Sequence, residues 1–373
     1  MNPPSVPDQH TGASPEFLAL FRDHAGDDGT MTFARFMELA LYDPLLGYYQ
    51  RARRRIGYEP DTDFFTASTS GAVFGELVAA ACVALLGDED PREHCFVEIG
   101  TEPPVPETPV GNSSSSSLPG DPHAGSNNPT PKPSPSPQGI LSGVRHPFGT
   151  ARTIGLGGPI RLKGKCVVFS NELFDAQPFH RFVFRRGAWR ELGVQLRGKT
   201  LCGVELSAAT PAALPEVGVE GYVIDAPLAS RALAERVAGE PWTGLFVAID
   251  YGKTWRELIE ETPSGTARAY FRHTQSNDLI AQPGEQDLTC HICWDWLSTA
   301  LLQHRFEQPQ VESQEAFFIR HSGGVIASTS ANEAARFSRK KLSLLQLLHP
   351  SHLGQKFQVL HALRRSTPPP AVP

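Results

Sequence analysis

The 373-residue chain has few cysteines for its length. Its six cysteines are spread over the sequence, which is too few and too scattered for a disulfide framework in a chain this long. Such cysteine usage fits a reducing compartment. We therefore expect a cytoplasmic protein.

The sequence also lacks an excess of basic residues and any long apolar run. It has 34 Lys and Arg against 40 Asp and Glu, a formal net charge of −6. Because nucleic acids and anionic membranes select basic surfaces, we expect no nucleic-acid partner. No stretch approaches the roughly 20 apolar residues that span a bilayer, and residues 1–17 lack the pattern of a targeting peptide. We therefore expect no membrane insertion.

Apolar residues make up 40% of the chain, enough for a substantial core. One segment departs from this composition. Residues 101–139 contain 11 Pro, 8 Ser and 4 Gly. A segment so poor in apolar side chains cannot offset its ordering entropy, so it is predicted to be a disordered insert. The alternative is a polyproline II stretch at residues 131–135 that binds a partner.

The residues before the insert predict helices followed by one strand. Residues 1–90 form the N-terminal helical part, with helix caps at Ser14 and Thr32 and a longer apolar helix over residues 70–87. Residues 91–100, which include "CFVEIG", predict the first core strand.

The residues after the insert predict the remainder of an α/β core over residues 140–330. Continuous apolar runs at 166–169 and 245–249 are typical of strands that are covered on both faces. The alternating run "RFVFRRGAWREL" predicts a half-exposed hairpin with its turn at residues 186–187. Residues 331–373 are expected to form C-terminal helices and a tail. The pattern predicts an α/β fold with a Rossmann-like, doubly wound, mostly parallel sheet.

Polar side chains follow three of the predicted strands. They lie at residues 98–100, 171–175 and 250–252. In open parallel sheets, ligands bind beyond the carboxyl ends of the strands. These residues are therefore candidates for a small-molecule site, although an acid at a strand end can also simply cap a turn.

Several motifs, taken in order, resemble the MidA-like family of class I S-adenosylmethionine-dependent methyltransferases, relatives of the mitochondrial enzyme that assists assembly of respiratory complex I. The motifs are "TDFFTASTSGAVFGEL", "VEIG", "NELFDAQP", "IDYG", "PGEQDLTCH" and "LLHPSHLGQKFQVL". The most specific is "NELFDAQP", which matches the family pattern Asn-Glu-x-x-Asp-Ala-x-Pro. The resemblance covers most of the chain outside the insert.

The resemblance implies a class I methyltransferase fold with S-adenosyl-L-methionine as cofactor. It also implies a protein substrate, such as a respiratory complex subunit, that is methylated on arginine. Two carboxylates can hold a guanidinium by paired hydrogen bonds, so Glu172 and Asp175 are the candidate catalytic residues; the alternative is that they cap the following helix. The cofactor-binding residues that the resemblance implies are Glu98, Gly100, Asn171, Asp63, Phe64 and Thr66.

The chain departs from the family pattern at the first strand. The family continues Glu-Ile-Gly with Pro-Gly-x-Gly, whereas this chain has Thr101-Glu102-Pro103-Pro104. Two prolines remove two backbone donors and restrict φ, so the usual cofactor turn is absent. Residues 68–69 are Ser-Thr where the family has Pro-Glu. Residues 140–165 are too few for a full βαβαβ passage, which suggests a truncated sheet. The glycines within residues 154–160 are not expected to replace the lost turn, because no helix pattern follows them.

Two hypotheses therefore stay open: an active methyltransferase, or a catalytically inactive relative (a pseudoenzyme) that serves as a scaffold or assembly factor. A nicotinamide-dependent enzyme is disfavoured because Gly-x-Gly-x-x-Gly is absent after the first strand. No metal site is expected. Cys290 and Cys293 form a lone C-x-x-C, and no second pair stands at the spacing of a structural zinc site.

Overall fold

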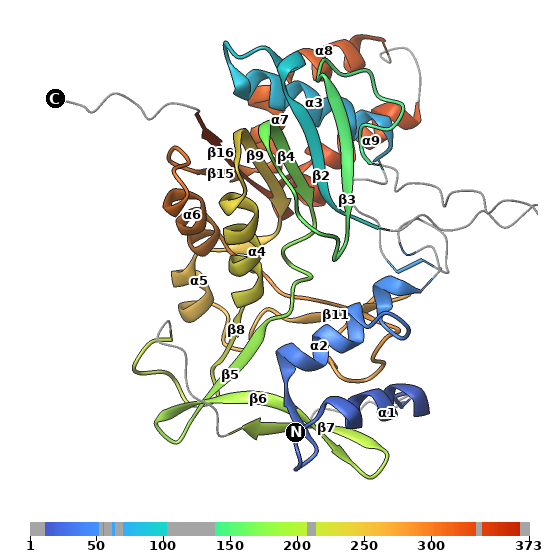
Figure 1. The fold of residues 1–373 in the computed structure, drawn as a ribbon, viewed down its shortest axis with the longest axis vertical. Helices are drawn as coiled ribbons and strands as arrows, with labels where there is room; N and C mark the ends of the chain where they lie inside the picture. The colour runs from blue at the N-terminus through green and yellow to red at the C-terminus, as the bar shows by residue number, and fades with distance from the viewer. Residues whose placement is uncertain are drawn as a thin grey trace, which may run out of the picture.

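The structure of the protein is a computed structural model that describes residues 12–51, 55, 62–63, 70–102, 139–206, 214–332 and 338–365. Of the predicted insert, residues 103–138 lie outside the described part of the chain. The helices of the described part (Figure 1) are α1 (Pro15–His24), α2 (Phe33–Tyr42), η1 (Tyr48–Gln50), α3 (Ala72–Leu86), η3 (Pro91–Glu93), α4 (Leu228–Gly239), α5 (Trp255–Glu260), α6 (Trp294–Gln303), α7 (Gln314–His321), α8 (Gly323–Asn332), α9 (Arg339–Leu348) and η4 (Pro350–Gly354).

The largest sheet has six strands in the order β15-β16-β9-β4-β2-β3. Their bounds are β2 (Cys95–Thr101), β3 (Thr150–Gly155), β4 (Gly164–Asn171), β9 (Trp242–Asp250), β15 (Gln310–Ser313) and β16 (Gln358–Arg364). Strands β3, β2, β4 and β9 pair in parallel, whereas β16 is antiparallel to both of its neighbours. The α/β class predicted from the sequence is confirmed, and the sheet is mixed.

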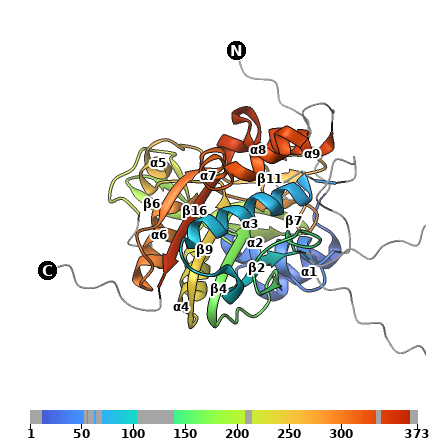
Figure 2. The ribbon, with the colours of Figure 1, turned by 90° about the horizontal axis from the view of Figure 1, so that it is seen from above.

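Helices cover both faces of this sheet (Figure 2). Along β4, Val167 and Phe169 pack with α3, α7 and α9, while Cys166 and Val168 pack with α4 and α6 on the other face. Because successive side chains of a strand point to opposite faces, a strand covered on both sides needs apolar residues throughout. This explains the continuous apolar run that the sequence shows at residues 166–169.

A second sheet has the strand order β1-β6-β5-β8, with β7 paired to β6. Its strands are β1 (Thr30–Thr32), β5 (His180–Arg185), β6 (Ala188–Arg197), β7 (Thr200–Leu206) and β8 (Val223–Ala226). The predicted hairpin is confirmed: Arg185 pairs with Ala188 across a two-residue turn. Arg186 and Gly187 both have positive φ, 51° and 75°, as such a tight turn requires.

Smaller sheets complete the described part. They contain β10 (Gly252–Lys253) paired with β14 (Ile292–Cys293), and β11 (Arg268–Phe271) between β12 (Thr274–Ser276) and β13 (Asp287–Thr289). Within the described residues, the longest apolar helix is α3, and no helix meets the length and hydropathy that crossing a bilayer requires. The six cysteines are all free.

The predicted N-terminal helices are confirmed. The side chain of Ser14 accepts a hydrogen bond from the N–H of Phe17 at the start of α1, and that of Thr32 accepts one from Arg35 at the start of α2. The expectation of helices throughout the C-terminal region is wrong in part, because residues 358–364 form β16. Their neighbouring side chains Val359 and Leu360 pack into opposite core clusters, as in a central strand.

Candidate active site

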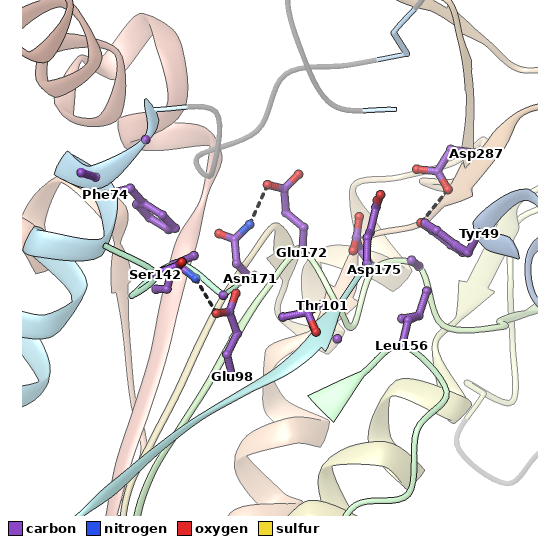
Figure 3. Close-up of a pocket in the computed structure, with 17 residues that line it drawn as sticks. Tyr49, Phe74, Glu98, Thr101, Ser142, Leu156, Asn171, Glu172, Asp175 and Asp287 are labelled. Carbon is purple, nitrogen blue, oxygen red and sulfur yellow. Dashed lines mark hydrogen bonds between the residues drawn. The ribbon is translucent and has the colours of Figure 1, made fainter. Parts of the chain in front are cut away.

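The carboxyl ends of β2 and β4 lie side by side, because the two strands pair in parallel with Ile99 opposite Ser170. Just beyond them is a hollow of about 410 Å³ (Figure 3). Five residues predicted from the sequence line it: Glu98, Gly100, Asn171, Glu172 and Asp175. Residues more than 70 positions apart in the chain thus meet at one place, as the sequence pattern predicted.

Glu98 stands on β2 near its end. One of its carboxylate oxygens, Oε2, accepts a hydrogen bond of 2.7 Å from the backbone N–H of Ile140. Burial raises the pKa of Glu98 to about 7, and the hydrogen bond from Ile140 opposes this shift. A carboxyl group with such a pKa changes charge near neutral pH.

Gly100 allows the backbone to change direction near the end of β2. Its φ is +89°, and a Cβ atom there would lie 2.7 Å from Cδ1 of Leu173. A side chain at position 100 would therefore meet both backbone strain and a clash. The glycine of the "VEIG" motif is required by this close approach of β2 to the segment after β4.

Asn171 and Glu172 occupy the end of β4 and the residue after it. Nδ2 of Asn171 donates to Oε1 of Glu172 over 3.0 Å, whereas Oδ1 of Asn171 is buried without a hydrogen-bond partner. Glu172 has a φ of +50°, which is unfavourable for a residue with a side chain. Strained residues and unpartnered buried acceptors are frequent where a protein binds a ligand.

Asp175 is buried at the inner wall of the hollow. Asp250, at the end of β9, accepts hydrogen bonds from the N–H groups of Phe174 and Asp175, which holds this segment in place. Burial, and then the charge of Asp250, raises the pKa of Asp175 well above its usual value. Its Oδ1 atom has no hydrogen-bond partner within the protein.

Tyr49 and Asp287 are among the residues of the hollow that the sequence did not predict as site residues. The hydroxyl of Tyr49 donates to Oδ1 of Asp287 over 2.8 Å, and both residues line the hollow. Burial raises the pKa of Asp287 to about 7, opposed by the Tyr49 hydrogen bond. Asp287 belongs to the motif "PGEQDLTCH". This motif contributed to the family resemblance but did not indicate a functional role for Asp287.

Not every predicted site residue reaches the hollow. The carboxylate of Asp63 accepts hydrogen bonds from the hydroxyl of Tyr48 (2.6 Å) and the N–H of Arg272 (2.8 Å), and Asp63 does not line the hollow. Its observed contacts hold the turn between β11 and β12. Phe64 and Thr66 lie outside the described residues.

Glu102 occupies part of the segment that replaces the family's glycine turn. It lines the hollow, and its Oε2 atom is 3.0 Å from Nη1 of the buried Arg55. The hollow is thus lined by five carboxyl groups, those of Glu98, Glu102, Glu172, Asp175 and Asp287. Such a wall suits a positively charged ligand.

A second hollow of about 570 Å³ adjoins the first and shares with it Glu172, Asp175 and Asp287. Its other walls include the rings of Tyr251, Tyr270, His291 and Phe357. The shared carboxyl groups therefore stand between two spaces, one beside β2 and one lined with aromatic rings.

The "TCHIC" segment contributes to the core. Cys290 and Cys293 are fully buried, and in the described part of the chain they belong to no group of three or more metal-ligand side chains. Burial raises the pKa of the Cys293 thiol to about 12.

An α/β sheet with helices on both faces and a hollow at its parallel strand ends is the arrangement in which proteins of this class commonly bind small molecules. Comparison with known proteins agrees. Residues 158–309 match a family described as "Putative S-adenosyl-L-methionine-dependent methyltransferase". A protein from Burkholderia thailandensis, solved with S-adenosyl-homocysteine bound, shares the fold with a TM-score of 0.72 at 21% identity, over 96% of this chain and 95% of that one. A native crystal structure from the same organism gives a TM-score of 0.69 at 20% identity.

Curated relatives carry the name "Protein arginine methyltransferase NDUFAF7, mitochondrial". The mouse protein is 23% identical over 52% of this chain and 45% of its own length. The zebrafish protein is 24% identical over 90% of this chain and 84% of its own length. The chain thus spans about half the length of the mouse relative. The resemblance read from the motifs is confirmed: the chain is similar to S-adenosylmethionine-dependent methyltransferases of the MidA-like family.

Proposed function

We propose that this protein transfers a methyl group from S-adenosylmethionine to an arginine side chain of a partner protein. The observation that carries the proposal is the meeting of Glu98, Asn171, Glu172 and Asp175 at one hollow beyond the parallel strands. The arginine acceptor is suggested by the name of the curated relatives and by the carboxyl groups that two hollows share.

The residues that line the first hollow suit S-adenosylmethionine. The hollow lies within the range of roughly 300–1,000 Å³ that small-molecule sites occupy, and it contains buried acceptors without partners on Asn171 and Asp175. Gly71 and Ala72, at the start of α3, line the same hollow, and no side chain caps this helix. Free N–H groups at a helix start suit a carboxylate, and acidic side chains suit an amino group or a sulfonium.

When bound, the cofactor supplies an electrophilic methyl group on a positively charged sulfur. The residues of this chain would place the acceptor and take up its proton. Glu172 and Asp175 face the second hollow and can hold a guanidinium by paired hydrogen bonds. An arriving cation lowers the pKa of Asp175, so binding favours its ionised form, which can accept the proton released on methylation.

The aromatic residues that line the second hollow suggest that the arginine acceptor binds in this hollow. Rings of Tyr251 and Tyr270 can lie against the flat face of a guanidinium. Together with the carboxyl groups they would favour arginine over neutral side chains.

The second candidate is the inactive scaffold. Two observations favour it: Glu102 stands in the altered turn and is paired with Arg55, and the carboxylate of Glu98 already binds the N–H of Ile140. Both groups are thus partly occupied by the protein itself. The cytoplasmic location and a respiratory complex subunit as partner stay predictions.

Binding of the cofactor and of its product separates the two candidates. Calorimetric titration of the full chain with S-adenosylmethionine and S-adenosyl-homocysteine should show one site. Glu98→Gln should weaken binding by about 10- to 100-fold, the effect of a charged hydrogen bond. The matched control is Glu93→Gln, whose exposed carboxylate pairs with Lys165 away from the hollow. Absence of binding in the unmodified chain would support the scaffold.

Transfer itself needs a second measurement. Radiolabelled cofactor and an arginine-containing protein extract should yield methylarginine with the unmodified chain. In Glu172→Gln, cofactor binding should persist while methylarginine formation drops. Full transfer by this variant, or label on a residue other than arginine, would contradict the proposed role of Glu172 and the proposed acceptor respectively.

A further inference from the structure

A group of three potential metal ligands lies at the edge of the main sheet, on residues that line neither hollow of the candidate active site. It consists of Glu312 on β15, His321 at the end of α7, and His361 on β16. One ligand atom from each lies within 4.8 Å of the other two. In the described part of the chain, no other group of three such residues gathers in this way.

The local fold brings these residues together. β15 and β16 pair antiparallel, with Gln310 opposite His361 and Glu312 opposite Val359, so Glu312 and His361 point to the same face. Helix α7 starts directly after β15, where the side chain of Ser313 caps it, and it ends at His321 over that face.

Packing fixes the orientation of the three side chains. The ring of Phe317 lies 5.2 Å from that of His321 and 5.7 Å from that of His361. Side-chain exposure is 11% for Glu312 and His361 and 16% for His321. Nη1 of Arg320 lies 2.8 Å from Oε2 of Glu312 and so holds the carboxylate with its other oxygen toward the histidines. Such outer partners commonly orient metal-ligating carboxylates.

The distances match a tetrahedral metal site. Oε1 of Glu312 lies 3.2 Å from Nε2 of His361 and 3.4 Å from Nε2 of His321. Ligands about 2.05 Å from a tetrahedral zinc ion stand about 3.3 Å apart. Nε2 of His321 is buried and makes no hydrogen bond within the protein. A metal ion would satisfy this nitrogen.

We propose that Glu312, His321 and His361 bind a zinc-like divalent transition metal ion, with water as the fourth ligand. Two imidazole nitrogens and one carboxylate oxygen suit zinc, whereas magnesium and calcium prefer oxygen ligands only. The ion would join β15, β16 and α7 and thereby stabilise the edge of the sheet.

Metal titration of the full, chelator-treated chain tests this proposal. Zinc chloride in a calorimeter should bind with one equivalent, and cobalt chloride should give the visible absorption of tetrahedral cobalt. His321→Gln and Glu312→Gln should each weaken zinc binding by at least about tenfold, because each variant replaces one of the three proposed metal ligands with a neutral amide. Saturating zinc should raise the melting temperature of the unmodified chain but not of these variants.

The matched control is His352→Ala. His352 is exposed and lies beside His349, with ring centroids 5.3 Å apart, so it reports adventitious binding to surface histidines. His352→Ala should bind zinc with the same affinity as the unmodified chain. Circular dichroism verifies that each variant is folded. No zinc binding by the unmodified chain, equal binding by His321→Gln, or loss of binding in His352→Ala would each overturn the proposal.

Discussion

The carboxylate of Glu98 accepts a hydrogen bond of 2.7 Å from the N–H of Ile140, which is 42 residues later in the chain. This contact joins the end of β2 to the segment that follows the predicted insert. Glu102 and Gly139, which flank residues 103–138, both line the candidate active site. The two ends of the insert therefore meet at the hollow itself.

Because these ends meet, residues 103–138 should be replaceable by a short Gly-Ser linker. We expect the variant to fold, and its free energy of unfolding to rise by about 1 kcal/mol, because a shorter loop costs less entropy to close. Urea denaturation measures stability, and calorimetry measures the affinity for S-adenosyl-homocysteine. Retained folding with lost affinity would show that the insert contributes to the site.

Gly100→Ala should destabilise the protein by about 1–3 kcal/mol, because it combines a positive φ with a clash. The added Cβ would lie 2.7 Å from Leu173. Gly203→Ala is the control, since a Cβ there meets nothing within 4 Å and φ is ordinary. Urea denaturation of both variants gives the comparison. Equal stability of the two would contradict the close packing at Gly100.

Affinity for S-adenosylmethionine should rise with pH through about 7. Glu98 and Asp287 have pKa values raised to about 7 by burial, and their ionised forms attract the cationic cofactor. If one such group must be ionised, affinity increases about tenfold between pH 6 and pH 8. S-adenosyl-homocysteine lacks the sulfonium charge and should show a weaker dependence. A pH-independent affinity for both ligands would contradict this prediction.

The same raised pKa values have the opposite effect on stability. The folded chain holds protons that the unfolded chain releases, so the free energy of unfolding should fall as pH rises from about 4 to about 7. Denaturation in urea at several pH values, without ligand, provides the measurement. In Glu98→Gln the decline should be shallower.

Asp225→Asn should destabilise the second sheet. Oδ1 of Asp225 lies 2.6 Å from Nε of Arg181 on the paired strand, and Oδ2 accepts hydrogen bonds from the N–H groups of Thr266 and Ala267. Removing one partner of a buried ion pair costs about 3–5 kcal/mol. Glu38→Gln, which breaks the exposed pair with Arg35, should cost less than about 1 kcal/mol. Comparable losses in the two variants would show that burial does not strengthen the Asp225 pair.

Local features of the fold were predictable because their causes are local. Helix caps at Ser14 and Thr32 and the turn at Arg186 depend on neighbouring residues and were found in the sequence. Residues 331–373 were expected to form helices and a tail, yet residues 358–364 form a strand. Their strand form depends on β9 and β15, which lie on either side of them.

The site was predictable where a strand ends in polar side chains. Glu98, Asn171 and Asp175 were found in this way, whereas Tyr49 and Asp287 reach the hollow by contacts between distant elements. The Glu312, His321 and His361 group shows no motif spacing, because two antiparallel strands that are far apart in the sequence and the end of a helix bring it together.

The sequence by itself determined the resemblance to methyltransferases, the α/β class and the acids at the ends of the first core strands, because motifs and apolar periodicity are properties of neighbouring residues. Only the tertiary structure decided which acids share a hollow, that Asp63 stands apart from it, and that two histidines face Glu312. The physical reason is that distances between remote residues depend on strand order and helix packing, which form only when the whole core is buried together.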